Sequence, residues 1–339
     1  MRYYAGLDLH SNNTYVGILD EKGTKVYKAK IQNHLPMILG ILRPYQGSIV
    51  GAVVESTFNW YWLVDGLMEE SYKVHLANPA AIKQYEGLKH TNDYYDAFYL
   101  ADLLRLGLLK QGHIYPKKER AIRDLLRKRM MLMRQRTSHI LSFQSLYNRE
   151  KGSKFSSNQI KKLREENIEG LFADEYVSLS AKTTISLIRD LEEKIKELER
   201  VVLEPMKGLP EFVKLKTVTG IGDILAMTIS LETGDIRRFP KVGNYSSYCR
   251  CVSSQRLSNE KKKGENNRKN GNKYLSWAFV EAANFSKRYC PYAKSFYNRK
   301  LAKTNNKILA IKALAHKLAR ASYFVMRDRV DYDPKKAFG

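Results

Sequence analysis

The chain has 339 residues, 43% of them hydrophobic, and its 59 Lys and Arg against 35 Asp and Glu give a formal net charge of +24. This length favours at least two domains. No run approaches 18 uninterrupted apolar residues, so we expect no membrane span, and Asp8 interrupts the apolar start that a signal peptide would need. Three cysteines are too few for a disulfide framework or a zinc site and fit a reducing cytoplasm. The positive charge indicates a polyanionic partner, most simply nucleic acid.

The positive charge is concentrated in the later parts of the chain. Residues 1–110 have a net charge of zero, whereas residues 111–164 carry +12, residues 165–209 carry −5 and residues 210–339 carry +17. A single basic run is usually a solvated surface, but two segments of this charge favour contact with nucleic acid. The partition predicts a neutral domain with a different task from the basic segments.

The first third of the chain has the pattern of an α/β domain. Short segments of alternating or β-branched residues predict five strands, at residues 3–9, 14–19, 25–31, 49–54 and 73–77. Helical spacing of apolar residues predicts three helices, at residues 34–42, 59–70 and 93–109. Three strands in succession, followed by helices and strands in alternation, predict a mixed five-stranded sheet with helices on its faces.

The middle of the chain is expected to form two long helices. Residues 116–150 give a basic helix, and we expect its arginines, Arg127 and Arg134 among them, to contact phosphates. Residues 177–202 carry apolar side chains at alternating steps of four and three, the heptad pattern of a coiled coil. This seam favours a contact between subunits, although a helical hairpin within the chain, with residues 161–175 as the partner, would use the same side chains.

Pro205 and the Gly-Leu-Pro segment at 208–210 predict the end of the second long helix. We therefore predict three domains: an α/β domain at 1–115, a basic helix and coiled-coil linker at 116–209, and a mainly helical domain at 210–339.

Two glycines in the last domain lie between helical patterns. Gly220 and Gly222 resemble the turn of a helix-hairpin-helix motif, in which bare backbone N–H groups approach a phosphate without reading bases. A plain turn that needs glycine for its positive φ is the alternative. The +17 charge of the segment favours the phosphate contact.

Four carboxylates in the neutral domain are candidates for chemistry. Asp8 lies within the first strand and Glu55 ends the fourth, while Asp93 and Asp96 lie three apart at the start of a helix and project from one face. An acid within a buried strand is costly unless it is paired or binds a cation. If the four converge, they form an oxygen-lined site for Mg²⁺, whose ions activate the attacking and leaving groups in phosphodiester chemistry. A helix-start acid favoured by the helix dipole and a surface acid at a strand end are the structural alternatives.

A second candidate region is a polar, cation-rich segment before the helix expected at 274–283. Serine hydroxyls among cations can attack a phosphate whose developing charge the cations stabilise. Chemistry alone does not choose among Ser253, Ser254 and Ser258, and such serines usually only hydrogen-bond within a loop. The cations expected to contact nucleic acid here are Lys261, Lys262, Lys263, Arg268 and Lys269.

These motifs together resemble the DEDD-type insertion-sequence transposases, recombinases guided by a bridge RNA and related to the pilin-gene invertases. The N-terminal half of the resemblance, a RuvC-like or RNase H-like domain, rests on Gly6-Leu7-Asp8-Leu9-His10, Val54-Glu55-Ser56-Thr57 and Asp93-Tyr94-Tyr95-Asp96-Ala97. The C-terminal half rests on Thr219-Gly220-Ile221-Gly222, the segment 234–240, Ser258-Asn259 and Lys269-Asn270-Gly271-Asn272. The resemblance covers nearly the whole chain.

The resemblance implies that Asp8, Glu55, Asp93 and Asp96 are catalytic, Mg²⁺-binding carboxylates and that Ser258 is the nucleophilic serine. It implies a transposase that cuts and joins donor and target DNA, with a noncoding RNA pairing with both. It also implies a homo-oligomer, dimer or tetramer, whose active sites combine the two halves of different subunits, and a nucleoid-associated protein of the prokaryotic cytoplasm.

The sequence departs from the family pattern at two places. Thr91-Asn92 stands where the family commonly has Lys-Thr before the first helical Asp, and Asn259 follows the serine where glycine is usual. The first departure puts a basic contact in question and the second puts the loop geometry in question. Neither changes the five proposed reactive groups.

Two other functions remain compatible with these patterns. In the first, a RuvC-like nuclease cuts DNA with a metal-activated water and Ser258 is structural. In the second, a non-enzymatic protein packages RNA or DNA and owes its acids to folding. A covalent serine–DNA link distinguishes the recombinase from both.

Overall fold

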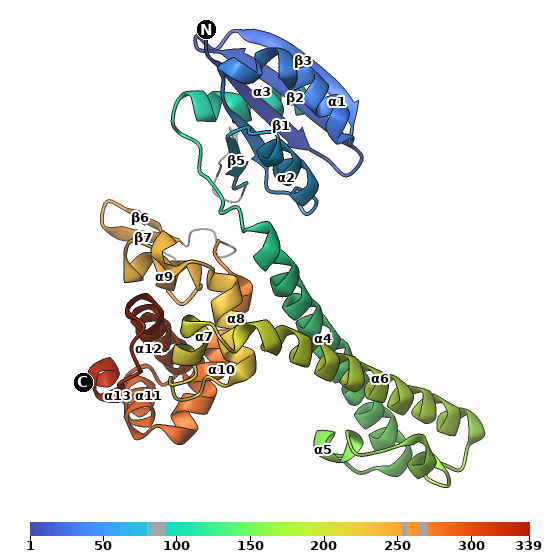
Figure 1. Cartoon of the computed structure of the whole chain (residues 1–339). Helices are drawn as coiled ribbons and strands as arrows, with labels where there is room; N and C mark the ends of the chain where they lie inside the picture. Colours follow the sequence, from blue (N-terminus) through green and yellow to red (C-terminus); the bar gives the residue numbers. More distant parts are fainter. Residues whose placement is uncertain (80–81, 83–91, 253–255, 265–269) are drawn as a thin grey trace. The chain divides into compact units, whose positions relative to one another are not determined.

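The computed structural model describes residues 1–79, 82, 92–252, 256–264 and 270–339, and it divides the chain into two compact units. The first unit is Met1–Lys117 and the second is Lys118–Gly339 (Figure 1). Across the described ranges, no helix is both long and apolar enough to cross a membrane.

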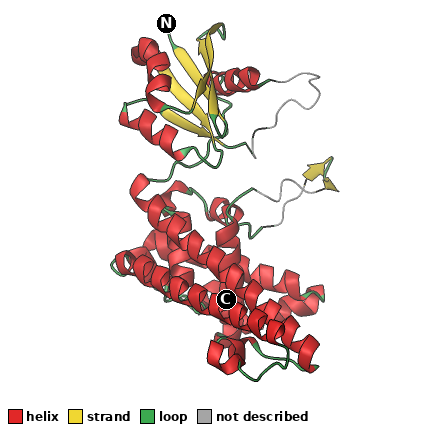
Figure 2. Ribbon diagram, turned by 90° about the vertical axis from the view of Figure 1, so that its right-hand side faces the viewer, coloured by secondary structure: helices red, strands yellow, loops and turns green. Residues whose placement is uncertain are grey.

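The first unit contains the predicted mixed five-stranded sheet. Its strands are β1 (Tyr3–Leu9), β2 (Asn13–Asp20), β3 (Lys25–Gln32), β4 (Ile49–Glu55) and β5 (Val74–Ala77). They lie in the order β3-β2-β1-β4-β5, with the first two pairings antiparallel and the last two parallel. Figure 2 draws this sheet in yellow with red helices beside it. Parallel pairing is confined to strands joined by helices, because only a crossover connection returns the chain in the same direction.

The two faces of the sheet are covered by different helices. Leu7, Leu9 and other odd-numbered side chains of β1 pack with α1 (Leu35–Leu42) and α2 (Tyr61–Glu69), and a short 3-10 helix, η1 (Arg43–Ser48), connects α1 to β4. The opposite face, which carries the even-numbered residues of β1, packs with α3 (Asp93–Arg105). The helix α3 ends earlier than expected because Gly107 adopts a positive φ of 69°.

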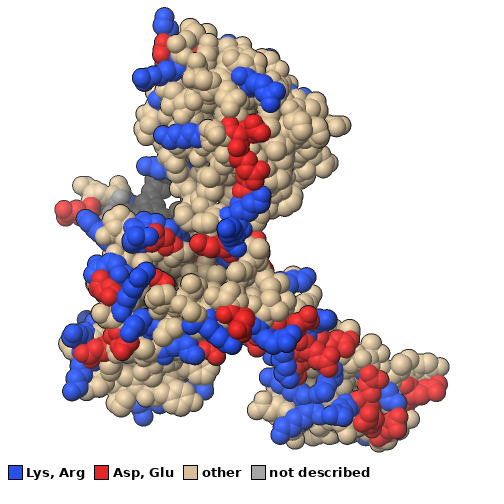
Figure 3. All heavy atoms as spheres, viewed as in Figure 1, with Lys and Arg blue, Asp and Glu red and all other residues tan. Residues whose placement is uncertain are grey.

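The second unit begins with an antiparallel pair of long helices, α4 (Lys117–Lys151) and α6 (Glu175–Met206), joined through α5 (Ser157–Ile160) and η2 (Glu165–Ile168). Arg129 of α4 pairs with Glu199 of α6 at 2.6 Å. The acidic segment thus neutralises part of the basic helix, and both signs of charge are interspersed along the pair (Figure 3). Half of the predicted seam is buried, at Ala181, Ile188, Ile195 and Val202. Ile140 and Phe143 of α4 lie in one hydrophobic cluster with Ala181, Ile188 and the neighbouring Ile185.

The surroundings of the seam within the chain extend the hairpin alternative. Within the chain, α4 packs along the seam, and residues 161–175, the partner named in the hairpin alternative, also cover its first part through side chains such as Ile168 and Phe172. The helix α6 ends at Met206, between Pro205 and the Gly-Leu-Pro segment, as predicted. Both Val202 and Met206 are buried in the core of the helices that follow, which holds this last turn in place.

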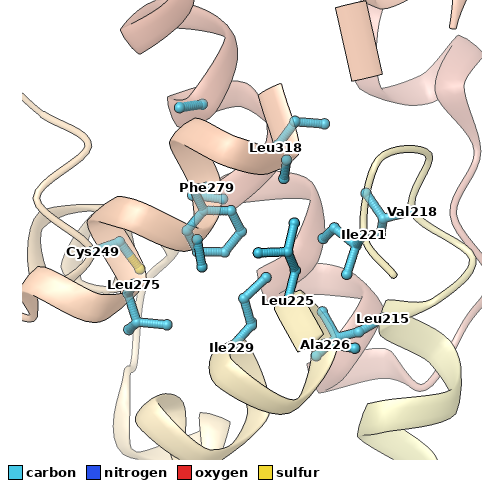
Figure 4. Close-up of a cluster of buried hydrophobic side chains, with 14 of the residues drawn as sticks. Leu215, Val218, Ile221, Leu225, Ala226, Ile229, Cys249, Leu275, Phe279 and Leu318 are labelled. Carbon is cyan, nitrogen blue, oxygen red and sulfur yellow. The ribbon is translucent and has the colours of Figure 1, made fainter. Parts of the chain in front are cut away.

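The remaining helices form one core, shown in Figure 4 around Leu225, Phe279 and Leu318. They are α7 (Pro210–Leu215), α8 (Asp223–Thr233), η3 (Ile236–Arg238), α9 (Val242–Tyr248), α10 (Lys273–Tyr289), α11 (Pro291–Thr304), α12 (Lys307–Asp328) and α13 (Pro334–Phe338). A two-stranded hairpin of β6 (Arg256–Ser258) and β7 (Lys261–Gly264) lies between α9 and α10, where only a loop was expected.

Candidate functional site

The sheet places two of the predicted carboxylates side by side. In the parallel pair of β1 and β4, Leu7 is the partner of Val54, so the next residues, Asp8 and Glu55, lie at the same level of neighbouring strands. Carboxyl ends of parallel strands meet at one edge of a sheet. Asp8 is 5% exposed, so its charge is held in a largely buried position.

The helix α3 supplies the other two carboxylates because it lies very close to β1. A Cβ atom on Gly6 would lie 1.9 Å from the Ala97 carbonyl oxygen, so only glycine permits this approach. Ala97 directly follows Asp96, and the close contact therefore holds the first turn of α3 beside Asp8. The side chain of Asn92 caps this turn by accepting a hydrogen bond from the Tyr95 N–H at 2.9 Å. The first departure from the family pattern is Thr91-Asn92. Asn92 serves there as the helix cap, while Thr91 lies outside the described residues.

Burial, together with the neighbouring carboxylates, raises the pKa values of two of these acids. Burial raises the pKa of Glu55 to about 7, aided by its hydrogen bond to Asp8 and by the charges of Asp8 and Asp96. Burial, then the charges of Asp8 and Asp93, raises the pKa of Asp96. A cleft of about 250 Å³ borders Glu55 and Asp96. The structure therefore brings the four predicted acids within electrostatic reach of one another, and two of them, Glu55 and Asp96, line the cleft.

One further residue of this cluster, His10, was not singled out from the sequence. Its Nε2 lies 3.0 Å from Asp8 Oδ2 and 3.8 Å from Asp93 Oδ1. Ligand atoms of Asp8, His10 and Asp93 all lie within 4.8 Å of one another, close enough to share one metal ion. Carboxylate oxygens are the donors that Mg²⁺ prefers, so the set fits a divalent cation, with His10 orienting Asp8.

Replacing Glu55 with Gln is expected to stabilise the first unit at pH 8 in the absence of divalent ions. A carboxyl whose pKa is raised by folding carries no penalty below its ordinary value of 4.5, and the penalty grows with pH until it is complete above about 7. We expect a gain of about 1–2 kcal/mol at pH 8, less than the full shift implies because solvent reaches the carboxyl. Thermal unfolding in EDTA measures it. The gain must vanish near pH 4.5 and be absent in Glu21→Gln, an exposed acid of the same unit.

The serine hairpin places Ser258 at the end of β6, directly opposite Lys261 of β7. Both residues are exposed. The two turn residues, Asn259 and Glu260, have φ values of 51° and 60°, which is the left-handed geometry of a type I′ hairpin turn. Asparagine adopts positive φ values more readily than most residues. Asn259 therefore supports the same left-handed turn that the glycine usual in the family would favour.

The structure describes only some of the other residues predicted in this region. Lys263 is exposed on β7. Ser253, Ser254, Arg268 and Lys269 lie outside the described residues, and the Lys262 side chain lies outside the described atoms.

Arg127 has a structural partner instead of a free charge. Its Nε and Nη2 atoms donate to the two oxygens of Glu232, at 2.6 and 2.7 Å, and Asn272 Nδ2 donates to the same carboxylate at 2.7 Å. Glu232 is only 2% exposed. Asn272 caps α10 through the N–H groups of Tyr274 and Leu275. The buried carboxylate therefore joins α4, α8 and the start of α10, and it pairs with Arg127, for which a phosphate contact was expected.

Removing the carboxylate in Glu232→Ala is expected to cost about 3 kcal/mol of unfolding free energy, because Arg127 and Asn272 lose their shared acceptor. Chemical denaturation of the full chain measures the loss. Glu199→Ala, which removes the more exposed partner of Arg129, is the matched control and should cost no more than about 1 kcal/mol. Equal losses of unfolding free energy in the two variants would show that the buried Glu232 carboxylate contributes no more to stability than the exposed Glu199 does.

The remaining predicted phosphate contacts lie in contrasting surroundings. A Cβ atom on Gly220 would meet the Ala282 carbonyl oxygen at 2.5 Å, so this glycine is needed for packing against α10. Gly222 is exposed and a Cβ there would meet nothing within 4 Å, but the adjacent Asp223 pairs with Lys216 at 2.7 Å. Arg134 is exposed on α4. Of these residues, Gly222 and Arg134 are exposed, and their contact with nucleic acid stays a prediction.

Comparison with known proteins assigns both halves of the chain to one group of enzymes. Residues 5–149 match the DEDD transposase family of the IS110 type, and residues 213–298 match the family described as Transposase IS116/IS110/IS902. A curated relative from Pseudomonas aeruginosa, a "Probable family 20 transposase", is 25% identical over 289 residues, which is 81% of this chain and 82% of the relative. With a mixed five-stranded sheet that gathers the acids and a helical remainder, the chain belongs to the IS110-type transposases, enzymes that cut and rejoin DNA.

Proposed function

We propose that this transposase is an RNA-guided DNA recombinase in which Ser258 attacks a DNA phosphate and the carboxylate cluster binds Mg²⁺. The observation that carries the proposal is the hairpin, which presents the Ser258 hydroxyl opposite Lys261 at an exposed turn. A serine that served only to stabilise a loop would not need a cation as its cross-strand partner. The four carboxylates supply the second half of the chemistry.

The proposed step exchanges one phosphodiester bond for another. The Ser258 Oγ forms a bond to phosphorus, the bond from phosphorus to one deoxyribose oxygen breaks, and that oxygen takes up the proton that the serine loses. Lys261 and Lys263 lie on the neighbouring strand, where their charges oppose the negative charge that develops on the phosphoryl oxygens. The bond between serine and phosphate is itself a phosphodiester, so the energy of the broken DNA bond is conserved in it. A DNA hydroxyl can therefore displace the serine and rejoin the strand.

The carboxylates of Asp8, Glu55, Asp93 and Asp96 would hold the cation, with His10 fixing the orientation of Asp8. When bound, Mg²⁺ neutralises charge on the phosphate and on the leaving oxygen. Glu55 must give up its proton when the cation binds, because the protonated carboxyl offers fewer donor oxygens. We propose that the cluster and the serine hairpin act on the same DNA within a homo-oligomer.

A guide RNA fits the distribution of charge. The second unit carries nearly all of the net positive charge, on exposed residues such as Arg134, Lys261 and Lys263. These residues contact backbones rather than base edges, so a separate molecule must supply the sequence information. In the proposed complex, base pairing by the RNA selects donor and target DNA, as in the bridge-RNA recombinases that the sequence resembles.

The test is a trapping assay on end-labelled donor DNA with Mg²⁺ and RNA transcribed from the noncoding DNA on either side of the gene. The recombinase is expected to leave DNA attached to protein after denaturation, with phosphoserine on the peptide that contains Ser258, and only when the RNA is present. Cut DNA without any protein link would instead support the metal-dependent nuclease, in which water is the nucleophile.

A further inference from the structure

The sheet face that carries Asp8 continues outward as a row of paired residues. Asp8 of β1 is the partner of Tyr15 on β2, and Tyr15 is the partner of Lys30 on β3, so these three side chains lie on one face. The Tyr15 ring meets the His10 ring edge-on, with centroids 5.6 Å apart. The row joins the carboxylate cluster to the outer edge of the sheet.

The edge strand β3 repeats this arrangement along its length. Lys28 is the partner of Gly17 and Lys25 is the partner of Leu19, which places both on the face covered by α3. Each ammonium group lies over an aromatic ring: Lys25 is 4.9 Å from the Phe98 centroid, Lys28 is 5.3 Å from that of Tyr94, and Lys30 is 5.2 Å from that of Tyr15. Cations and rings therefore alternate along one surface.

A groove of about 400 Å³ lies between β3 and α3, and its lining includes Lys25, Lys28, Asn92, Tyr94 and Tyr95. We name it the lysine–tyrosine groove. Because Asn92 directly precedes Asp93, the groove begins beside the carboxylates. Its volume is that of a small-ligand cleft, which accommodates roughly a nucleotide of a single strand and not the width of a duplex.

We propose that the lysine–tyrosine groove guides one locally unpaired strand of the DNA substrate into the carboxylate cluster. Lysines contact successive phosphates, and exposed rings such as Tyr95, 38% exposed, provide surfaces on which bases stack. The strand is DNA because the groove leads to carboxylates that act on DNA, and in this respect the inference rests on the proposed function.

Lysines on edge strands also prevent strands from pairing between molecules. That role is served from either face of a strand, whereas all three lysines here lie on the face of Asp8. The three lysines lie in successive rows, each above an aromatic ring. A phosphate backbone running along this face needs such a regular row of cations, whereas protection of a strand edge does not.

Photocrosslinking tests the groove without requiring catalysis. The full chain in the Ser258→Ala background, in EDTA, is mixed with a forked DNA that carries 5-iododeoxyuridine in its single-stranded arm, and an RNA arm of the same sequence is run in parallel. We expect crosslinks on Tyr94 or Tyr95 that fall at least tenfold in the variant K25Q/K28Q/K30Q. The slope of log K against log salt should fall by about 2, at about 0.7 per lost phosphate contact.

The matched control is K22Q/K73Q/K110Q, which removes three exposed charges from other positions of the same unit. Equal crosslinking in the two triple variants would overturn the proposal, as would crosslinks confined to the second unit. Crosslinks to the groove by the RNA arm alone would overturn the assignment to DNA. None of these outcomes depends on a serine link or a bound metal, so they are separable from failure of the proposed function.

Discussion

Ser258→Ala is expected to abolish the covalent protein–DNA adduct and to lower strand exchange by roughly 10⁴-fold or more, the loss usual when a nucleophile is removed from a preorganised site. The change deletes one exposed oxygen atom from the end of β6 and leaves the Asn259–Glu260 turn intact, so folding and DNA binding should not change. Denaturing gels of labelled DNA measure the adduct, and thermal unfolding measures the fold.

Ser253→Ala and Ser254→Ala are the natural controls, because chemistry alone offers these hydroxyls as equally good nucleophiles. Both variants are expected to form the adduct at the wild-type level. If an adduct persists in Ser258→Ala and disappears in one of the other two, the nucleophile has been misassigned. If DNA is still cut in all three variants, water is the nucleophile.

The carboxylate cluster was predictable because each of its parts leaves a strong local pattern. Asp8 stands inside an apolar strand, Glu55 ends a β-branched strand, and Asp93 and Asp96 have helical spacing. Strand order then brings the four together. The close approach of Gly6 to Ala97 explains why a glycine and an alanine accompany these acids, although sequence alone does not tell which backbones will meet.

Features that depend on tertiary partners were not predictable in the same way. Nothing in the heptad pattern of α6 identifies α4 as the helix that packs against it. The charges of the two segments, −5 for residues 165–209 and +12 for residues 111–164, favour such a pairing. The short strand that ends at Ser258 has no apolar alternation, and its hairpin depends on the left-handed turn at Asn259.

The acids that pair with individual arginines also could not be predicted from the sequence. Arg127 and Arg134 have the same pattern on α4, yet only Arg127 meets a buried acid. The available signal was Glu232, an acid in the apolar stretch of α8, which must find a cation or a donor when it is buried. His10 was missed because a single histidine after a strand is common, and only the folded structure shows that it lies against both Asp8 and Asp93.

Asp8→Asn is expected to lower DNA cleavage by about 10³-fold, corresponding to several kcal/mol of transition-state stabilisation that a bound cation provides. The replacement keeps the shape of the side chain but offers a neutral oxygen at the centre of the proposed metal site. It also removes a negative charge that repels Glu55 and Asp96, so the metal-free variant should be at least as stable as the wild type.

The response of stability to Mg²⁺ separates a metal ligand from an acid needed only for folding. At a Mg²⁺ concentration one hundred times its Kd, binding should stabilise the wild-type first unit by about 2.7 kcal/mol, whereas Asp8→Asn should gain little. Asp65→Asn, on α2 and away from the cluster, should respond as the wild type does. An Asp8→Asn protein that is destabilised yet keeps its Mg²⁺ response would mean that Asp8 serves folding. Because the cluster already holds a proton on Glu55 near neutral pH, the Mg²⁺ response of the wild type should strengthen from pH 6 to 8 as that proton is more easily displaced.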